Sequence, residues 1–371
     1  MITRVEYNFP TDLESILKRI GEIDPIKYGR SRNFISGDVT YLSPYISRGV
    51  ISVNMIKDAV LKRGFKLYQI EKFVQELAWR EYWQRIWQNK GDEILTDLKQ
   101  KQPDYLHNKM PEGFVNASTS IDAIDNYIDQ LYEQGYMHNH IRMYVGALAC
   151  NIAKAHWLQP AKWLYYNLLD GDIASNHLSW QWVCGSASSK KYYCNQENIN
   201  RYTGSNQKNS FLDVSYEAME EMLVPTALKD TIVLNLQTIL PETTTLKIDS
   251  NKPTCIYNSY NLDPFWRKDE DVNRVLLLEP SHFEKYPVNQ KVIEFIINLS
   301  KNIDGIILHV GEFSDLLEPY NADKSFLLYK EHPAFKHYKG ICDSREWMAK
   351  NITGSYNSFF SFWKKAGKEI F

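Results

Sequence analysis

The sequence lacks the features that mark secreted, metal-binding and membrane-spanning proteins. Its cysteines form no CxxC pair and no spacing typical of zinc or iron–sulfur sites, so we expect reduced core residues and no bound metal. No apolar run reaches the roughly 18 residues that a membrane span requires, and the opening MITRVEYNFP lacks the apolar core of a signal peptide. These absences predict a soluble, cytoplasmic protein. The cysteines are Cys150, Cys184, Cys194, Cys255 and Cys342.

An excess of one charge sign is also missing. The chain has 43 lysines and arginines against 45 aspartates and glutamates, a formal net charge of −2. Without an overall basic field, any contact with nucleic acid must come from a local patch. Aromatic residues, in contrast, make up 13% of the chain. This content suits a protein that handles a flat ring system, although an aromatic-rich core accounts for most of it.

The 371 residues are enough for two domains, and the two parts of the chain follow different patterns. Over residues 1–226, apolar residues recur at the three-to-four spacing of amphipathic helices. Residues 227–250 carry prolines and threonines and are expected to be a linker. Residues 251–371 alternate short apolar runs with a helical stretch, which indicates a small parallel α/β domain. The predicted fold class is therefore multi-domain, all-helical followed by α/β.

These predictions rest on particular segments. The expected helices are ESILKRIGEI, MIKDAVLKRG, QIEKFVQELAWREYWQRIWQ, AIDNYIDQLYEQG, NHIRMYVGALACNIAKAHW, NQKVIEFIINLSKNI and SFFSFWKKAGKEIF. The expected buried strands are TCIYNSY, VNRVLLLEP, GIILHVGE and KSFLLYKEHP.

Two segments of the helical part place polar residues among apolar helix positions. In GDVTYLSPYISRGVIS, Thr40 and Ser43 precede Pro44, which can begin a helix. Hydroxyls and free N–H groups there could hold a phosphate, and a simple helix cap is the alternative. In QELAWREYWQRIW, Glu76 and Arg80 share a helix face beside Trp79, as a polar pocket or an exposed ion pair would require.

Two more segments combine polar and aromatic residues. In YMHNHIRMYVGALAC, Asn139, Arg142 and Met143 lie on one helix face. In DGDIASNHLSWQWVCG, Asp170 and Asp172 could accept hydrogen bonds from a ribityl chain, a ring imide or an arginine. An arginine facing the two carboxylates is the purely structural explanation, and spacing alone does not favour either.

Together, these four segments resemble the FAD-binding helical domain of DNA photolyases and cryptochromes, in the order and with separations similar to those of that family. The resemblance implies FAD bound in a U shape. Asn176 matches the residue that faces flavin N5, where an amide favours the fully reduced anionic flavin because a nearby acid could protonate its half-reduced form. The cofactor-binding residues that the resemblance implies are Tyr28, Thr40, Leu42, Ser43, Glu76, Arg80, Asn139, Arg142, Asp170, Asp172, Asn176 and Trp180.

The resemblance also implies a chain of tryptophans that carries electrons to the flavin. Trp180 matches its flavin-proximal member and Trp157 its middle member, although Trp157 could be an ordinary packing residue. No third, surface tryptophan can be placed. Tyr105 is available in the corresponding region, and Trp163 or a tyrosine could provide another exit.

The implied substrate is a cyclobutane pyrimidine dimer flipped out of UV-damaged DNA. Trp79 and Trp182 would stack on it, and Glu76 and Asn139 would bond the thymine edges. Enzymes for (6–4) photoproducts carry histidines where this chain has Asn139 and Met143, which makes that activity less favoured. The residues expected to act in the reaction are Glu76, Asn139, Met143, Asn176, Trp180 and Trp157, and those expected to bind substrate are Glu76, Trp79, Asn139, Met143 and Trp182.

The domain order is the reverse of the usual one. Photolyases normally place the α/β antenna domain first, whereas here the helical domain opens the chain and a shortened α/β domain follows. Whether this domain holds a second, antenna chromophore is open, with absence favoured. We therefore expect a monomeric, FAD-dependent, blue-light-driven photolyase. A cryptochrome-like blue-light receptor that signals through a partner is the alternative, and a helical scaffold without cofactor is the third possibility.

Overall fold

The computed structural model describes residues 5–242, 246–321 and 323–371, so the expected linker at 227–250 lies partly outside the described residues. The chain forms two compact units. Unit 1 comprises Met1–Asn8, Asp24–Val39 and Asp92–Leu236, and unit 2 comprises Phe9–Ile23, Thr40–Gly91 and Gln237–Phe371. Segments of the helical part thus contribute to both units, and the expected domain boundaries at 226 and 250 stay predictions.

The segments predicted as helices are helical. In unit 1 the helices are α2 (Pro25–Ser31), α6 (Glu112–Val115), α7 (Asp122–Gln134), α8 (Asn139–Ala147), α9 (Leu158–Asn167), α10 (Ile173–Cys184), α11 (Gln196–Thr203) and α12 (Tyr216–Glu220). In unit 2 they are α1 (Leu13–Gly21), α3 (Ser43–Ser47), α4 (Val53–Leu61), α5 (Leu67–Lys90), α13 (Pro280–Lys285), α14 (Gln290–Ser300) and α15 (Phe359–Ile370). Short 3₁₀ turns occur at Gly91–Leu95, Thr226–Leu228, Phe313–Leu316, Glu318–Tyr320, Lys324–Phe326 and Pro333–Phe335.

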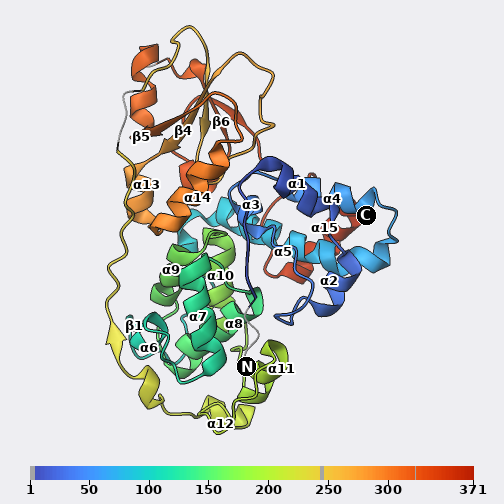
Figure 1. Cartoon of the computed structure of the whole chain (residues 1–371), viewed down its shortest axis with the longest axis vertical. Helices are drawn as coiled ribbons and strands as arrows, with labels where there is room; N and C mark the ends of the chain where they lie inside the picture. The colour runs from blue at the N-terminus through green and yellow to red at the C-terminus, as the bar shows by residue number, and fades with distance from the viewer. Residues whose placement is uncertain (1–4, 243–245, 322) are drawn as a thin grey trace. The chain divides into compact units, whose positions relative to one another are not determined.

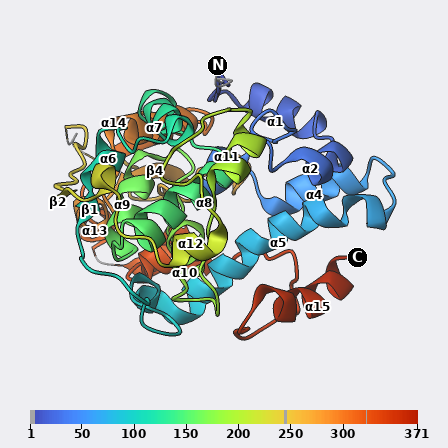
Figure 2. The same ribbon diagram turned by 90° about the horizontal axis from the view of Figure 1, so that it is seen from below.

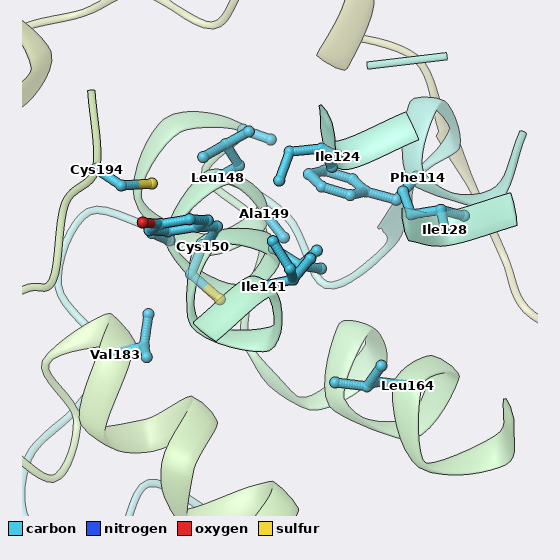
Figure 3. Close-up of a cluster of buried hydrophobic side chains, with 14 of the residues drawn as sticks. Phe114, Ile124, Ile128, Ile141, Leu148, Ala149, Cys150, Leu164, Val183 and Cys194 are labelled. Carbon is cyan, nitrogen blue, oxygen red and sulfur yellow. The ribbon is translucent and has the colours of Figure 1, made fainter. Parts of the chain in front are cut away.

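Unit 1 is a bundle in which α8 and α9 each pack against α10, and α7 packs against α8 (Figure 1). Its apolar core joins residues from these helices and from α6, including Phe114, Ile124, Leu164 and Val183 (Figure 3). The predicted helix at NHIRMYVGALACNIAKAHW is shorter than expected. It ends at Ala147 and continues as one π-turn, Leu148–Ile152. Unit 1 also holds a two-stranded antiparallel pair, β1 (Met110–Pro111) and β2 (Thr231–Ile232).

Unit 2 contains the predicted parallel sheet, with five strands in the described part of the chain in the order β5-β4-β3-β6-β7. Helices α13 and α14 follow β4 in the chain (Figure 1). The apolar runs predicted as strands form four of its members, and the fifth, β7, was missed because it is short and largely exposed. The strands are β3 (Thr254–Tyr257), β4 (Asn273–Leu278), β5 (Ile306–Val310), β6 (Leu327–Lys330) and β7 (Ile341–Asp343).

Aromatic side chains fill the carboxyl edge of this sheet, where the strand order reverses between β3 and β6. Open α/β sheets bind ligands at such a reversal. Here Tyr260, just after β3, stacks on His332, just after β6, with ring centroids 4.4 Å apart. Trp87 of α5 meets both rings edge-on, at 6.1 Å and 5.1 Å. The reversal point is therefore a packed aromatic cluster.

The C-terminal helix α15 packs on α5 (Figure 2). Phe359 stacks on Trp79, with centroids 3.9 Å apart and planes 11° from parallel. Ser358 caps the start of α15, where its hydroxyl accepts a hydrogen bond from Ser361 N. The aromatic face predicted for this helix is thus used in packing. Within the described residues, no helix combines the length and apolarity needed to cross a bilayer.

Candidate functional site

A buried ion pair joins the start of α8 to the loop before α10. Arg142 donates to both carboxylate oxygens of Asp170, at 3.0 and 2.8 Å, and its Nε donates to Met137 O. Burial alone would lower the pKa of Arg142, but the charge of Asp170 offsets this effect and the pKa is raised. Gly135 ends α7 in the left-handed conformation, and a Cβ there would lie 2.7 Å from the Leu169 side chain. This close approach holds the loop that carries Asp170.

The first turn of α10 presents several polar groups. Asp172 caps the helix by accepting from Ser175 N at 2.7 Å. Asn176 donates its side-chain amide to Ala161 O of α9 at 2.8 Å, which fixes the orientation of the amide. The Ser175 hydroxyl is buried and has no hydrogen-bond partner among the described residues. Buried polar atoms are rarely left unpaired, so this hydroxyl points to a bound molecule.

Trp180 lies one helical turn beyond Asn176, on the buried side of α10. Gly146 of α8 makes room for it, because a Cβ at that position would lie 3.3 Å from Val183 and 3.6 Å from the Trp180 ring. The absence of a side chain at Gly146 therefore allows α8 and α10 to pack closely around the indole.

Trp157 is completely buried and its indole N–H is engaged by a carboxylate. Trp157 Nε1 donates to Asp97 Oδ1 at 2.8 Å, and Ser186 donates to the same oxygen at 3.0 Å. His156 Nε2 lies 3.4 Å from that oxygen. Burial would raise the pKa of Asp97, but the hydrogen bonds it accepts outweigh burial and lower it. The carboxylate is therefore ionised at neutral pH.

His177 is expected to make stability depend on pH. The ring is buried and accordingly its pKa is lowered to about 4, although a hydrogen bond with Ile173 O opposes the shift. As pH falls from about 6.5 toward 4, the unfolded chain gains a proton that the folded protein resists, so the free energy of unfolding drops by about 1.4 kcal/mol per pH unit for this group. Urea unfolding at several pH values should show a shallower acid slope for His177→Asn, and an unchanged slope would contradict this assignment.

Three of the four residues predicted to bind phosphates, Thr40, Leu42 and Ser43, lie in unit 2 at the start of α3. Pro44 occupies the first turn of α3, as predicted, and the helix has no side-chain cap hydrogen bond among the described residues. Leu42 occupies the cap position, and Thr40 Oγ1 accepts from Leu42 N at 3.5 Å just before the helix. Leu42 is buried, so only its backbone could face a ligand. Tyr28 lies in unit 1, on α2.

The remaining predicted residues divide between the two units. On α5 of unit 2, Glu76 and Arg80 are half-buried, and Trp79 has the Phe359 ring against one face. On α8 of unit 1, Asn139 is exposed and Met143 half-buried. In unit 1, α8 carries Asn139 and Met143 and packs against α10, and Arg142 of α8 pairs with Asp170 in the loop before α10.

Trp182 behaves differently from its neighbour Trp180. It leaves 39% of its surface exposed, whereas Trp180 is only 3% exposed. Two residues turn a helix by about 200°, so α10 turns one indole inward and the other outward. Tyr192 lies beside the outward ring, at 6.0 Å between centroids.

Known proteins share the helical part of this chain. The family model for the FAD binding domain of DNA photolyase matches residues 73–211. The helical part of the chain is therefore similar to the FAD-binding domain of photolyases and cryptochromes. A deoxyribodipyrimidine photo-lyase from Streptomyces griseus is 27% identical over 168 residues, 43% of this chain and 35% of the relative. A cryptochrome DASH from Danio rerio is 26% identical over 43% of this chain and 32% of the relative.

A solved cryptochrome structure from Synechocystis is also similar, with 20% identity and a TM-score of 0.45 over 51% of this chain and 42% of that one. The chain spans about a third of the length of the curated relatives named above.

The domain model that matches residues 73–211 is a FAD-binding domain, and the groups of unit 1 fit this cofactor. The Arg142–Asp170 pair and the Asn176 amide offer donors and acceptors, and the buried Trp180 offers an apolar ring. The buried Ser175 hydroxyl lacks a partner among the residues that the structure describes. The donor set and this hydroxyl suit a polar ring system.

Sequence reasoning missed two groups of this site. Ser175 was overlooked because a serine in the first turn of a helix usually only supports capping. Asp97 was overlooked because it lies in a loop 60 residues before Trp157 and belongs to no motif. A residue that pairs with a distant indole leaves no periodic signal in one sequence.

Proposed function

We propose that this protein is a FAD-dependent, blue-light-driven photolyase that repairs cyclobutane pyrimidine dimers in DNA. The observation that carries the proposal is the arrangement of side chains on α10. Asn176 and Trp180 share one face of this helix, and Trp182 is exposed on another. An exposed indole offers a flat apolar surface on which a base can stack, a contact worth about 1–3 kcal/mol per base. One short helix therefore supplies residues for the flavin and for a flipped dinucleotide.

Each residue has a distinct task in this mechanism. Arg142, held by Asp170, would present a cation to the polar edge of a bound flavin ring, and Asn176, oriented by Ala161 O, would present its amide to N5. An amide cannot protonate N5, which preserves the anionic form. Glu76 on α5 accepts hydrogen bonds from the thymine edge, while Trp182 stacks on the flipped bases. FAD, when bound, supplies light-driven donation of one electron to the dimer and its recovery after the ring has opened.

We expect no antenna chromophore at the carboxyl edge of the sheet, because an aromatic cluster occupies that edge. Tyr260, His332 and Trp87 contact one another where open sheets of this kind bind ligands. In the proposed function the flavin alone absorbs the light.

Illumination of the full chain with a dimer-containing oligonucleotide under reducing conditions tests this function. Blue light should remove the dimers, and Glu76→Ala should slow removal about tenfold or more while FAD stays bound, since a lost hydrogen bond to a charged group costs about 1.5–3 kcal/mol. Glu71→Ala is the matched control, because Glu71 is exposed on the same helix and accepts a hydrogen bond from the neighbouring Gln75 side chain at 3.2 Å. If Glu76→Ala loses the flavin instead, the role assigned to Glu76 is wrong.

One observation favours the second candidate, a cryptochrome-like blue-light receptor. Phe359 of α15 stacks on a face of Trp79 that a bound dimer would need. If the wild type leaves dimers intact in light and Phe359→Ala repairs them, α15 blocks substrate and the receptor is the better description. If both repair at one rate, Trp79 does not contact the dimer.

A further inference from the structure

The surroundings of Trp157 suit oxidation of its indole. An indole that loses an electron becomes a strong acid at Nε1, and here that atom already donates to Asp97 Oδ1 at 2.8 Å. The carboxylate is held by two further donors, Ser186 Oγ at 3.0 Å and Gln102 N at 3.0 Å. Its negative charge stabilises a positive hole on the ring, and it is placed to take the proton.

A continuous set of rings leads from Trp157 toward solvent. The His156 ring lies 5.7 Å from the indole, and the Tyr105 ring lies 5.0 Å from His156. Two backbone hydrogen bonds hold the segment that carries Tyr105 beside the segment that carries His156. They run from Leu106 N to Lys154 O and from His156 N to His107 O, both at 2.8 Å. Tyr105 is half-buried, so the route ends at a phenol that water can reach.

We propose that Tyr105 is the terminal electron donor of this protein and that Asp97 is the proton acceptor of Trp157. The inference rests on the proposed function, because the oxidant is a bound, light-excited oxidised flavin. It fills the place of the surface tryptophan that the sequence lacks in this region.

The electrons and protons balance in three steps. With an oxidised, light-excited flavin bound, one electron would leave Trp157 for the flavin, and the Nε1 proton would move to Asp97. One electron then passes from Tyr105 to Trp157, the phenolic proton leaves to water, and the proton on Asp97 returns to Nε1. An external thiol finally restores Tyr105 by giving one electron and one proton. The Lys101 ammonium, 5.6 Å from the Tyr105 ring, disfavours a positive hole there and so couples oxidation to proton loss.

A second buried indole of unit 1, Trp163, donates to Tyr132 and is chemically unsuited to the role. Trp163 Nε1 donates to Tyr132 Oη at 2.9 Å, and that phenol donates to Val115 O at 2.9 Å. Neither a neutral phenol nor a backbone carbonyl is a base that can take the indole proton. Burial also raises the pKa of Tyr132 to about 12. A hole on Trp163 therefore has no proton acceptor comparable with Asp97.

Electron paramagnetic resonance of the illuminated full chain, made with ring-deuterated tyrosine, tests the route. Wild type and Tyr132→Phe should give a tyrosyl radical whose spectrum narrows on deuteration, and Tyr105→Phe should lose it and keep its FAD content. Transient absorption should show a neutral indole radical in wild type and a protonated, cationic one in Asp97→Asn. The role of Tyr105 would be contradicted if the tyrosyl radical were retained in Tyr105→Phe or lost in Tyr132→Phe. The role of Asp97 would be contradicted if Asp97→Asn gave the same neutral indole radical as wild type.

A failure of the proposed function gives a different result. If the protein repairs no dimers but still forms the Tyr105 radical, the proposed electron-transfer route is supported and the proposed repair function is contradicted. If no flavin is bound, the same variants are compared after ultraviolet photo-ionisation of the indoles. Loss of the tyrosyl signal in Tyr105→Phe alone then supports the route, and an unchanged signal contradicts it.

Discussion

Replacing Asp170 with asparagine should lower the free energy of unfolding by about 3–5 kcal/mol, because it leaves the Arg142 guanidinium buried without its counter-charge. The side chains are only 20% and 4% exposed, so water replaces little of the lost interaction. Flavin should be lost as well, since Arg142 then keeps its Nε contact with Met137 O but loses the carboxylate that orients the end of its guanidinium. Urea unfolding and the flavin content of the purified variant measure the two effects.

An exposed ion pair in the same unit provides the matched control. Asp104 accepts from Lys191 at 2.7 Å, but the aspartate side chain is 72% exposed. Exposed pairs are worth about 0–1 kcal/mol, so Asp104→Asn should change stability little and leave flavin binding intact. Equal destabilisation by the two variants would show that burial of Asp170 is not the cause.

Replacing Glu81 with glutamine should have a comparable effect on unit 2. Glu81 Oε1 accepts from Arg85 Nε at 3.0 Å, and Glu81 also accepts from the backbone N–H groups of Met348 and Ala349. Arg85 donates in turn to Ala349 O and Ile352 O, so this pair ties the chain before α15 to α5. Removing the negative charge should cost about 3–5 kcal/mol, because the guanidinium stays buried.

Denaturant unfolding and limited proteolysis measure this second effect. Proteolysis should become faster in the segment after Ala349, since its backbone loses the partners on α5. Glu71→Gln, on the exposed face of the same helix, should leave both measurements unchanged. A loss below about 0.5 kcal/mol for Glu81→Gln, the range of ordinary surface changes, would contradict the assigned role.

The sequence predicted the helices and most of the sheet because these elements carry their own periodicity. The apolar runs around Tyr257 and Leu278 are buried strands in the structure, as expected. Strand β7 escaped prediction because Ile341 and Cys342 are exposed and the run is only three residues long. Periodicity detects elements that bury a face, and this strand buries little.

The way the helical part divides between two units could not be predicted. It depends on contacts between residues far apart in the chain, such as Leu262 N donating to Arg48 O and Leu13 N donating to Asn302. The contact of Phe359 with Trp79 is of the same kind. Single-sequence patterns report neighbours one or two helical turns away, and these partners are hundreds of positions apart.

Within the site, an arginine was one of the partners predicted for Asp170, and Arg142 forms that ion pair. From their spacing alone, an arginine and a cofactor were equally favoured as the binding partner of Asp170 and Asp172. In the structure the partner of Asp170 is an arginine, Arg142. Asp172 caps α10 instead. The remaining assignments to FAD and substrate stay predictions, because they concern molecules that a sequence pattern cannot position.

The flavin fluorescence lifetime of the FAD-loaded chain tests the central claim most directly, namely that FAD lies against Asn176 and Trp180. An adjacent indole shortens the lifetime by giving an electron to the excited ring, so Trp180→Phe should lengthen it while FAD remains bound. Trp163→Phe, a change to another buried indole of the same core, should leave it as in wild type. Equal lifetimes for wild type and Trp180→Phe, or a chain that takes up no FAD, would contradict the account.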